Sequence, residues 1–252
     1  MILILIQTYL FILGLTLGSF YNVVGLRVAA GESIVRPRSS CPGCGHVLGA
    51  RELIPVLSYM IQKGKCRSCQ ARISPLYPMM ELLTGLLFVL SFHLIGFQLE
   101  LFVALTLVSL LIIITVSDLR YMIISDKVLL FFLPLFIVER VFIPLTPWWD
   151  MLIGAVVGFG LLLLIAIVSK GGMGGGDIKL YGVIGLVLGW KLVLVSFFLA
   201  TLLGAIFGLF GMMIGKVQRG KPMPFGPFIA LGVLIAYFYG TALLNWYFTF
   251  LI

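Results

Sequence analysis

The chain has 252 residues, of which 62% are hydrophobic and 10% are charged. Soluble domains are about 45–50% apolar and about 25% charged, so this composition excludes both a disordered chain and an ordinary soluble enzyme. On a soluble protein the net charge of +8 would indicate a nucleic-acid or acidic partner. On so apolar a chain it first indicates orientation in a membrane, and no nucleic-acid partner is expected.

Long runs without a charged side chain predict membrane-spanning helices, each of which needs about 20 mostly apolar residues. Six runs each predict one span: 1–26, 82–99, 101–117, 151–169, 192–215 and 222–252. Two shorter runs, 128–138 and 180–190, span only if their flanks join them. The first run lacks a basic start and is too long for a typical signal peptide, so we expect it to be retained. The predicted fold class is all-α and polytopic, with about eight transmembrane helices.

Basic residues predict the orientation, because short cytoplasmic loops carry an excess of Lys and Arg. With eight spans, all but two of the 17 basic residues fall on one side, the exceptions being Arg140 and Lys191. If the run 180–190 did not span, the basic cluster at 216–221 would fall on the opposite side. We therefore expect a multi-pass protein of the cell membrane, with both termini outside. Residues 25–76, called the insertion below, are expected in the cytoplasm, where anionic lipid headgroups are a candidate contact.

The insertion contains two C-x-x-C pairs, Cys41 with Cys44 and Cys66 with Cys69, separated by 21 residues. Each tight turn directs two thiolates at one ion, so two pairs complete the tetrahedral four-sulfur shell of a structural zinc site. Two disulfides and a redox pair are competing interpretations, which a reducing compartment disfavours. Because four sulfurs leave no open coordination position, we expect zinc to stabilise a zinc-ribbon-like insertion, without His46 as a ligand.

Three of the nine acidic residues lie where apolar runs end on the predicted cytoplasmic side: Asp118, Asp126 and Asp177. A carboxylate at this depth is costly to desolvate, which marks it as a functional candidate. Two carboxylates held close together share a proton, so one can activate water as a base while the other protonates a carbonyl oxygen. The sequence does not establish that Asp118 and Asp177 converge.

Two of these aspartates also have a structural interpretation. Asp118 could form an ion pair with a neighbouring basic residue, Arg120 or Lys127. Asp126 precedes an apolar run and is a good candidate for the N-cap of a helix.

The segment before Asp177 is rich in glycine, with five glycines among residues 171–176. The three that directly precede the acid are Gly174, Gly175 and Gly176. Glycines let a backbone approach another chain closely, so an extended peptide could lie beside the carboxylate, whereas an ion pair with Lys179 would not require them. The segment lacks the Lys-Ser/Thr ending of a phosphate-binding loop, so nucleotide binding is not expected.

In this order, the motifs resemble those of the bacterial type IV prepilin peptidases, membrane aspartic proteases of the GxGD class. The matching segments are residues 18–24 (GSFYNVV), the two cysteine pairs, Tyr77-Pro78 followed by Glu81-Leu82, Ser117-Asp118 followed by Ser125-Asp126, and residues 174–180 (GGGDIKL). The short length and the segment PRSSC at 37–41 are most similar to the competence-type enzymes of Gram-positive bacteria.

This resemblance implies two reactions. The first is cleavage of the basic leader from type IV prepilin or pseudopilin precursors, with Asp118 and Asp177 in the two catalytic positions. Beside these, Asp126, Lys179 and the three glycines are our candidates for substrate-binding or supporting residues. The second is methylation of the new N-terminal amine with S-adenosylmethionine, which the family associates with the cysteine-bearing region. Gly64, just before the second cysteine pair, is the candidate for the methyl-donor site.

The family usually has proline at the position of Ser125, where a serine side chain could cap the next helix instead. We expect residues 1–24 to form the first transmembrane helix, 25–76 the insertion associated with methylation, and 77–252 a seven-helix peptidase domain. A protease without methyltransferase activity is one alternative. Another is a non-enzymatic, zinc-bearing membrane adaptor or transporter subunit, in which the aspartates line a cation path.

Overall fold

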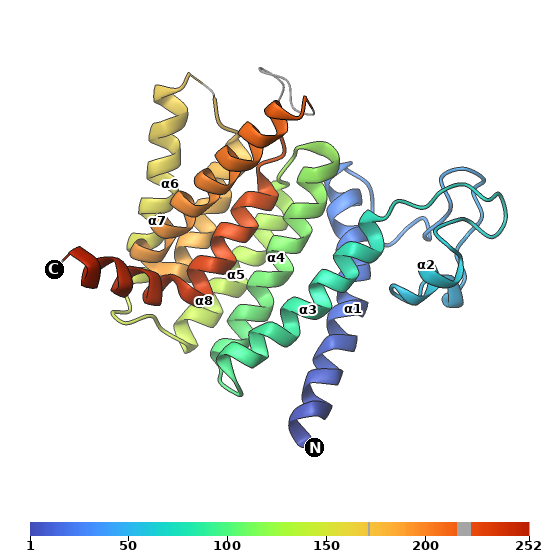
Figure 1. The fold of residues 1–252 in the computed structure, drawn as a ribbon, viewed down its shortest axis with the longest axis horizontal. Helices are drawn as coiled ribbons and strands as arrows, with labels where there is room; N and C mark the ends of the chain where they lie inside the picture. Colours follow the sequence, from blue (N-terminus) through green and yellow to red (C-terminus); the bar gives the residue numbers. More distant parts are fainter. Residues whose placement is uncertain (171, 216–222, 252) are drawn as a thin grey trace. The chain divides into compact units, whose positions relative to one another are not determined.

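The computed structural model describes residues 1–170, 172–215 and 223–251, which are nearly all helical (Figure 1). Gly171 and the basic cluster at 216–221 lie outside the described residues. Besides one 3-10 turn, Ala50–Glu52, the described residues form α1 (Ile2–Ala29), α2 (Leu57–Ile61), α3 (Leu76–Ile95), α4 (Glu100–Tyr121), α5 (Asp126–Phe142), α6 (Asp150–Val168), α7 (Gly175–Met213) and α8 (Gly226–Leu251).

Six of these helices are long and apolar enough to cross a membrane: α1, α3, α4, α6, α7 and α8. α5 is shorter, with 17 residues, and contains the predicted short run 128–138. α7 has 39 residues and is broken at Gly189, so the run 180–190 lies in its first half. With α5 and both halves of α7, the described residues contain eight apolar helical segments beside the short α2, which confirms the predicted all-α, polytopic fold class.

Several helices extend beyond the predicted uncharged runs. α1 continues through Arg27, α3 begins ahead of Glu81, and α4 includes Asp118. A charged side chain costs free energy inside a membrane but does not interrupt helical hydrogen bonding. Uncharged runs therefore mark the apolar centre of each helix and not its ends.

Contacts divide the chain into two compact units, Met1–Val116 and Ser117–Ile252. In the first unit, α1 and α3 pack closely on small residues. A Cβ atom on Gly14 would lie 2.7 Å from Cα of Gly85, and one on Gly18 would lie 2.9 Å from Cα of Glu81. Glycines at these positions let the two helix backbones approach, which is the usual packing device of membrane helices.

In the second unit, α7 packs against both α6 and α8 through glycines. A Cβ atom on Gly185 of α7 would overlap the backbone of Gly154 in α6. A Cβ atom on Gly232 of α8 would lie 2.6 Å from the carbonyl oxygen of Ser196 in α7. The two halves of α7 are thus each held against a neighbouring helix at backbone distance.

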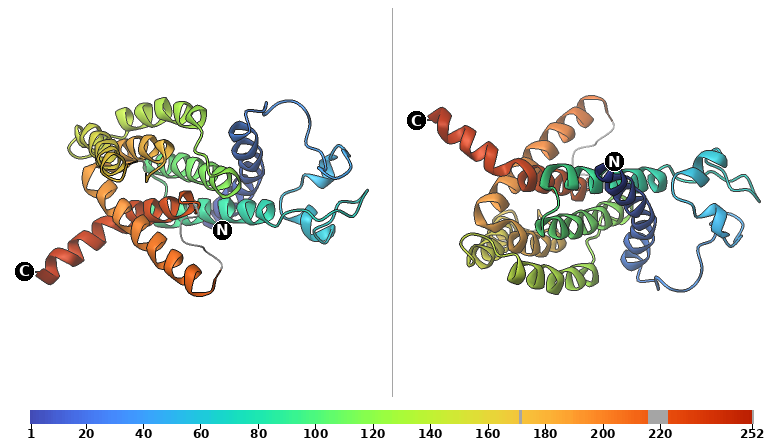
Figure 2. Two further views of the ribbon diagram at one scale, coloured as in Figure 1. Left: turned by 90° about the horizontal axis from the view of Figure 1, so that it is seen from above. Right: turned by 90° about the horizontal axis from the view of Figure 1, so that it is seen from below.

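The break in α7 is held by two charged side chains, and the change in helix direction is visible in Figure 2. Gly189 has φ 77° and ψ 172°, a conformation that favours glycine. Before the break, Arg140 donates hydrogen bonds from Nη2 and Nε to the carbonyl oxygen of Val187, at 2.7 and 3.1 Å. After it, Oδ1 of Asp150 accepts a hydrogen bond from the backbone N–H of Trp190 at 3.2 Å. The carbonyl of Val187 and the N–H of Trp190 have no helical hydrogen-bond partner at the break. The side chains of Arg140 and Asp150 supply the missing donor and acceptor.

Arg140 is buried, with 3% of its surface exposed. The sequence places this residue among the few basic charges on the outer side, but the guanidinium caps the end of a half-helix instead of facing solvent. Its charge suits that position, because the C-terminal end of a helix carries a partial negative charge.

Candidate active site and metal centre

Asp118 lies in the last turn of α4 and is buried, with 7% of its surface exposed. Its Oδ2 accepts a 2.6 Å hydrogen bond from the backbone N–H of Gly226, the first residue of α8. A Cβ atom on Gly226 would lie 2.8 Å from Cβ of Asp118, so the contact requires glycine there. The carboxylate is thus fixed by a helix N-terminus, whose free N–H groups and partial positive charge favour an anion.

Asp177 lies in the first turn of α7, which begins after Gly174 at the N-cap. Its carboxylate interacts with the backbone N–H of Gly174, and a Cβ atom on that glycine would lie 3.1 Å from Oδ2 of Asp177. A Cβ atom on Gly176 would lie 2.7 Å from Cβ of Ile124, whereas no described atom lies within 4 Å of one on Gly175. Two of the three glycines therefore have a packing reason, and the backbone at Gly175 is open.

The second unit brings the two carboxylates of Asp118 and Asp177 close enough to repel each other electrostatically. Each is oriented by the backbone N–H of a glycine at a helix N-terminus, Gly226 for one and Gly174 for the other. Neighbouring carboxylates do not both ionise easily, because the charge on one makes ionisation of the other more costly. This arrangement can supply a base and an acid together, as in aspartic proteases.

Asp126 is not an N-cap, which corrects the structural interpretation from the sequence. It is the first residue of α5, and its Oδ2 lies 2.7 Å from Nζ of Lys179. Ser125 stands at the N-cap, but its side chain makes no capping hydrogen bond. The helix begins one residue earlier than the capping interpretation requires, so Asp126 is already helical, and its exposed carboxylate pairs with the exposed ammonium of Lys179. Lys179 therefore pairs with Asp126 and not with the adjacent Asp177.

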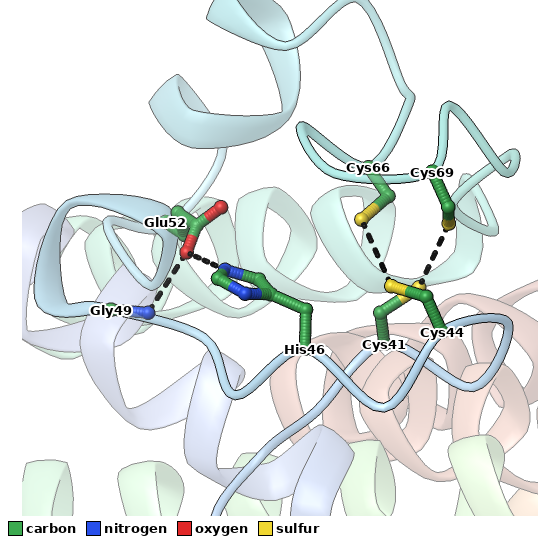
Figure 3. Close-up of polar contacts among 7 residues, drawn as sticks. All are labelled: Cys41, Cys44, His46, Gly49, Glu52, Cys66 and Cys69. Atoms are coloured by element: carbon green, nitrogen blue, oxygen red, sulfur yellow. Dashed lines mark hydrogen bonds and ion pairs between the residues drawn. The ribbon is translucent and has the colours of Figure 1, made fainter.

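The four cysteines converge in the insertion, as Figure 3 shows. Their sulfur atoms all lie within 4.8 Å of one another, with Cys41 and Cys69 3.7 Å apart and Cys44 and Cys66 4.0 Å apart. A tetrahedral zinc ion with Zn–S bonds of about 2.3 Å requires S···S distances of about 3.8 Å. The four sulfurs therefore fit one zinc ion, and all four thiols are free of disulfides.

The two cysteine turns have the same backbone hydrogen bonding. The N–H of Cys41 donates to the carbonyl of His46, and the N–H of Cys66 donates to that of Ala71, each at 2.9 Å. The backbone N–H groups of Cys69 and Ser68 donate to the Cys66 sulfur and lower its pKa to about 6. Metal ligands must be thiolates, so this environment favours the binding form of Cys66, whereas the pKa of Cys44 in the same cluster is raised.

His46 faces Glu52 and not the sulfur cluster (Figure 3). Its Nε2 lies 3.1 Å from Oε2 of Glu52, which also accepts a 2.9 Å hydrogen bond from the backbone N–H of Gly49. Hydrogen bonds from Gly49 and His46 lower the pKa of Glu52. The arrangement agrees with a four-sulfur donor set that needs no histidine.

Gly64, the candidate for the methyl-donor site, lies buried in the turn after α2. It has φ 69°, and a Cβ atom there would lie 2.9 Å from the hydroxyl oxygen of Tyr59. The turn geometry and the tyrosine ring therefore both require glycine.

Gly226 is the site residue that the sequence reasoning missed. The uncharged run 222–252 predicts a single span and hides the helix start within it. The available signal is the segment PFGP at 224–227, because glycine and proline often mark the beginning of a helix.

Comparisons with known proteins cover nearly the whole chain. Residues 12–95 match the family described as Bacterial Peptidase A24 N-terminal domain, and residues 105–209 match the Type IV leader peptidase family. A Bacillus subtilis (strain 168) protein named prepilin leader peptidase/N-methyltransferase is 47% identical, over 94% of this chain and 96% of the relative. A protein of the same name from Aeromonas salmonicida is 36% identical, over 85% and 76%, and one from Pseudomonas aeruginosa is 32% identical, over 95% and 92%.

No solved structure gives a significant match to this chain. The N-terminal domain match is followed along the chain by the leader peptidase match. Asp118 and Asp177 both lie within the second of these. The chain therefore belongs to the type IV leader peptidase family.

Proposed function

We propose that the protein cleaves the basic leader from type IV prepilin or pseudopilin precursors and methylates the new N-terminal amine. The observation that carries the first reaction is that Asp118 lies close enough to Asp177 to repel it electrostatically, with each carboxylate held by a glycine N–H at a helix N-terminus. The names of the relatives, prepilin leader peptidase/N-methyltransferase, support both reactions.

In cleavage, one carboxylate of the pair removes a proton from water while the other donates its proton to the scissile carbonyl oxygen. The water oxygen then bonds to the carbonyl carbon. Collapse of the tetrahedral intermediate breaks the C–N bond, and the leaving amine takes a proton from the pair. Gly174, Gly175 and Gly176 support substrate binding, since the open backbone at Gly175 gives an extended peptide a place to approach.

Asp126 and Lys179 have a supporting role in this scheme, as an ion pair between the first turns of α5 and α7. It joins the helix that carries Asp177 to its neighbour. Because both side chains are exposed, the pair contributes only about 0–1 kcal/mol to stability.

Methylation would use S-adenosylmethionine as the methyl donor and the N-terminal part of the chain as its site. Gly64 is the proposed donor-site residue, in a buried turn two residues before Cys66. When bound, the donor supplies an electrophilic methyl group on sulfur, and the protein supplies the orientation of the acceptor amine.

The four cysteines would hold a structural zinc ion, whose role is to close an insertion that has little core of its own. We place the insertion and both aspartates on the cytoplasmic side and both termini outside, on the basis of the basic residues. The functional parts proposed are residues 1–24 as an anchor, 25–76 for methylation and 77–252 for proteolysis. Contact of the basic insertion with anionic lipid belongs to the same proposal.

Purified protein with a prepilin substrate and S-adenosylmethionine tests both reactions, with intact-mass measurement of the product. Wild type should remove the leader and add one methyl group. Asp118→Asn and Asp177→Asn should each lower cleavage by about 100-fold or more while the protein stays in the membrane. Asp126→Asn, a matched removal of one carboxylate, should retain most cleavage.

The alternatives give different products in this experiment. Leader loss without methylation would indicate a protease alone. Normal cleavage by either aspartate variant would contradict the assignment. No cleavage by wild type would leave a membrane adaptor or transporter subunit as the better hypothesis.

A further inference from the structure

A buried carboxylate in the first unit takes no part in the proteolytic scheme. Glu81 lies in α3 with 8% of its surface exposed. Its Oε2 accepts a 2.7 Å hydrogen bond from the backbone N–H of Val56, and the side chain of Ser19 in α1 also hydrogen-bonds to it. It forms no ion pair with any described residue. A buried carboxylate without an ion-pair partner is costly to desolvate, which marks Glu81 as a functional candidate.

Asn22 supplies a second buried acceptor at the same helix crossing. It is 1% exposed, and its Nδ2 donates a 3.1 Å hydrogen bond to the backbone carbonyl of Tyr77. Its Oδ1 has no hydrogen-bond partner among the described residues. A buried acceptor without a donor costs about 1–3 kcal/mol, so its presence calls for a ligand that donates.

These side chains belong to one cluster because of helical spacing. Ser19 and Asn22 are one turn apart on α1, and Tyr77 and Glu81 are one turn apart on α3. Ser19 contacts Glu81 while Asn22 contacts Tyr77, so the two pairs cross-connect the helices. We call Ser19, Asn22 and Glu81 the acceptor cluster.

The chemistry of the acceptor cluster selects its ligand. A carboxylate and an amide oxygen accept hydrogen bonds and attract positive charge, and both are shielded from water. A primary ammonium group offers three N–H donors and one positive charge in a compact head. An N-terminal amine of a polypeptide has this chemistry at neutral pH.

We propose that the acceptor cluster binds the free N-terminal amine of the processed pilin and that Glu81 acts as the base for its methylation. This inference rests on the proposed methyltransferase function. The cluster lies within residues 12–95, the A24 N-terminal match that also contains the cysteines and Gly64.

The reaction balances with the methyl donor named above. The ammonium transfers a proton to the Glu81 carboxylate, and the resulting amine attacks the methyl carbon on sulfur. A C–N bond forms as the C–S bond breaks, which leaves a methylammonium and S-adenosylhomocysteine. Asn22 Oδ1 and the Ser19 hydroxyl orient the remaining N–H groups of the amine.

Glu81 also has a structural role to separate from this one, since it anchors the insertion through Val56. Glu81→Gln distinguishes the two roles. Its amide oxygen can still accept the hydrogen bond from Val56, whereas the negative charge and the base are lost. Glu32→Gln removes an exposed carboxylate from the same unit and is the matched control.

The test combines product analysis with binding. With prepilin and S-adenosylmethionine, Glu81→Gln should cleave at the wild-type rate and lower methylation about tenfold or more, whereas Glu32→Gln should do both normally. In the absence of donor, a synthetic peptide with the mature pilin N-terminus should bind wild type about tenfold more tightly than its N-acetylated form. Glu81→Gln, and Asn22→Leu as an independent variant, should abolish that difference.

The proposal is overturned if Glu81→Gln methylates normally, or if wild type binds the free and acetylated peptides equally. It is also overturned if the variants keep the preference for the free amine. Should Glu81→Gln lose cleavage as well, the peptide comparison on Asn22→Leu decides the matter. Cleavage without methylation by wild type would instead refute the proposed methyltransferase function itself.

Discussion

The backbone N–H of Gly226 donates a 2.6 Å hydrogen bond to Oδ2 of Asp118, so the first turn of α8 fixes a carboxylate at the end of α4. These residues are 108 positions apart in the chain. The backbone N–H of Phe225 also hydrogen-bonds to this carboxylate, so two consecutive residues at the start of α8 orient it. A residue without a functional side chain thus becomes part of the proposed catalytic machinery, through its backbone alone.

Replacing Gly226 with alanine should impair cleavage more than stability. A Cβ atom would meet Asp118 at 2.8–3.0 Å and displace its carboxylate. A displacement of this order lowers kcat by roughly 10-fold to 100-fold. Overpacking should cost about 1–3 kcal/mol in unfolding free energy. Gly160→Ala, where no described atom lies within 4 Å of the new Cβ, is the control. Unchanged kcat in Gly226→Ala would contradict a positioning role.

Alanine variants of the glycines before Asp177 should distinguish a role in substrate binding from a role in helix packing. Gly176→Ala places a methyl group 2.7 Å from Cβ of Ile124, so we expect a lower thermal unfolding temperature. Gly175→Ala meets no described atom, so stability should be unchanged. If an extended substrate lies along this backbone, Gly175→Ala should raise KM severalfold. Steady-state cleavage assays and thermal melts in detergent measure both effects, and an unchanged KM would argue against peptide contact at Gly175.

The ion pair between Asp126 and Lys179 should contribute little to stability or cleavage. Both side chains are more than half exposed, at 57% and 53%, and exposed pairs are worth about 0–1 kcal/mol. We expect Asp126→Asn and Lys179→Met each to lower the unfolding temperature only slightly and to retain most cleavage. Complete loss of cleavage in Asp126→Asn, with the chain folded, would give this carboxylate a direct part in the reaction.

Arg140 should be essential for the stability of the broken helix. Arg140→Met removes two hydrogen bonds to the carbonyl of Val187 and leaves that buried acceptor without a charged donor. A loss of about 2–4 kcal/mol in unfolding free energy is expected. Lys191→Met removes an exposed basic residue just beyond the break and should change stability little. Unfolding titrations in mixed micelles compare the two variants, and equal stabilities would show that Arg140 does not support the break.

Zinc should be present at one ion per chain and should depend on all four cysteines. Cys44→Ser replaces a thiolate ligand, so metal content measured by plasma mass spectrometry should fall to near zero. Ser68→Ala, a change beside Cys69 that removes no ligand, should keep the metal. Disulfides found by alkylation and mass spectrometry in freshly prepared protein would refute the metal site.

The sequence predicts the fold class well because membrane spans are a local property. About 20 apolar residues suffice to identify a helix in the bilayer, whatever that helix packs against. The helix ends were less predictable, because Arg27 and Asp118 continue their helices despite their charge. The break at Gly189 depends on Arg140 and Asp150, which lie 49 and 39 positions away in the chain, so no local pattern reveals it.

The types of chemistry could be predicted from the amino-acid sequence: two aspartates at the ends of apolar runs, a glycine-rich segment and two cysteine pairs at ligand spacing. These motifs are local features of the sequence. A rare charge in an apolar chain and a C-x-x-C turn can each be recognised without knowing which other residues they contact. Which of these groups lie close together is visible only in the folded chain. It brings Asp118 toward Asp177, pairs Asp126 with Lys179 and places Gly226 against a carboxylate. Such contacts depend on helix packing at backbone distance, which is set by side chains far apart in the chain.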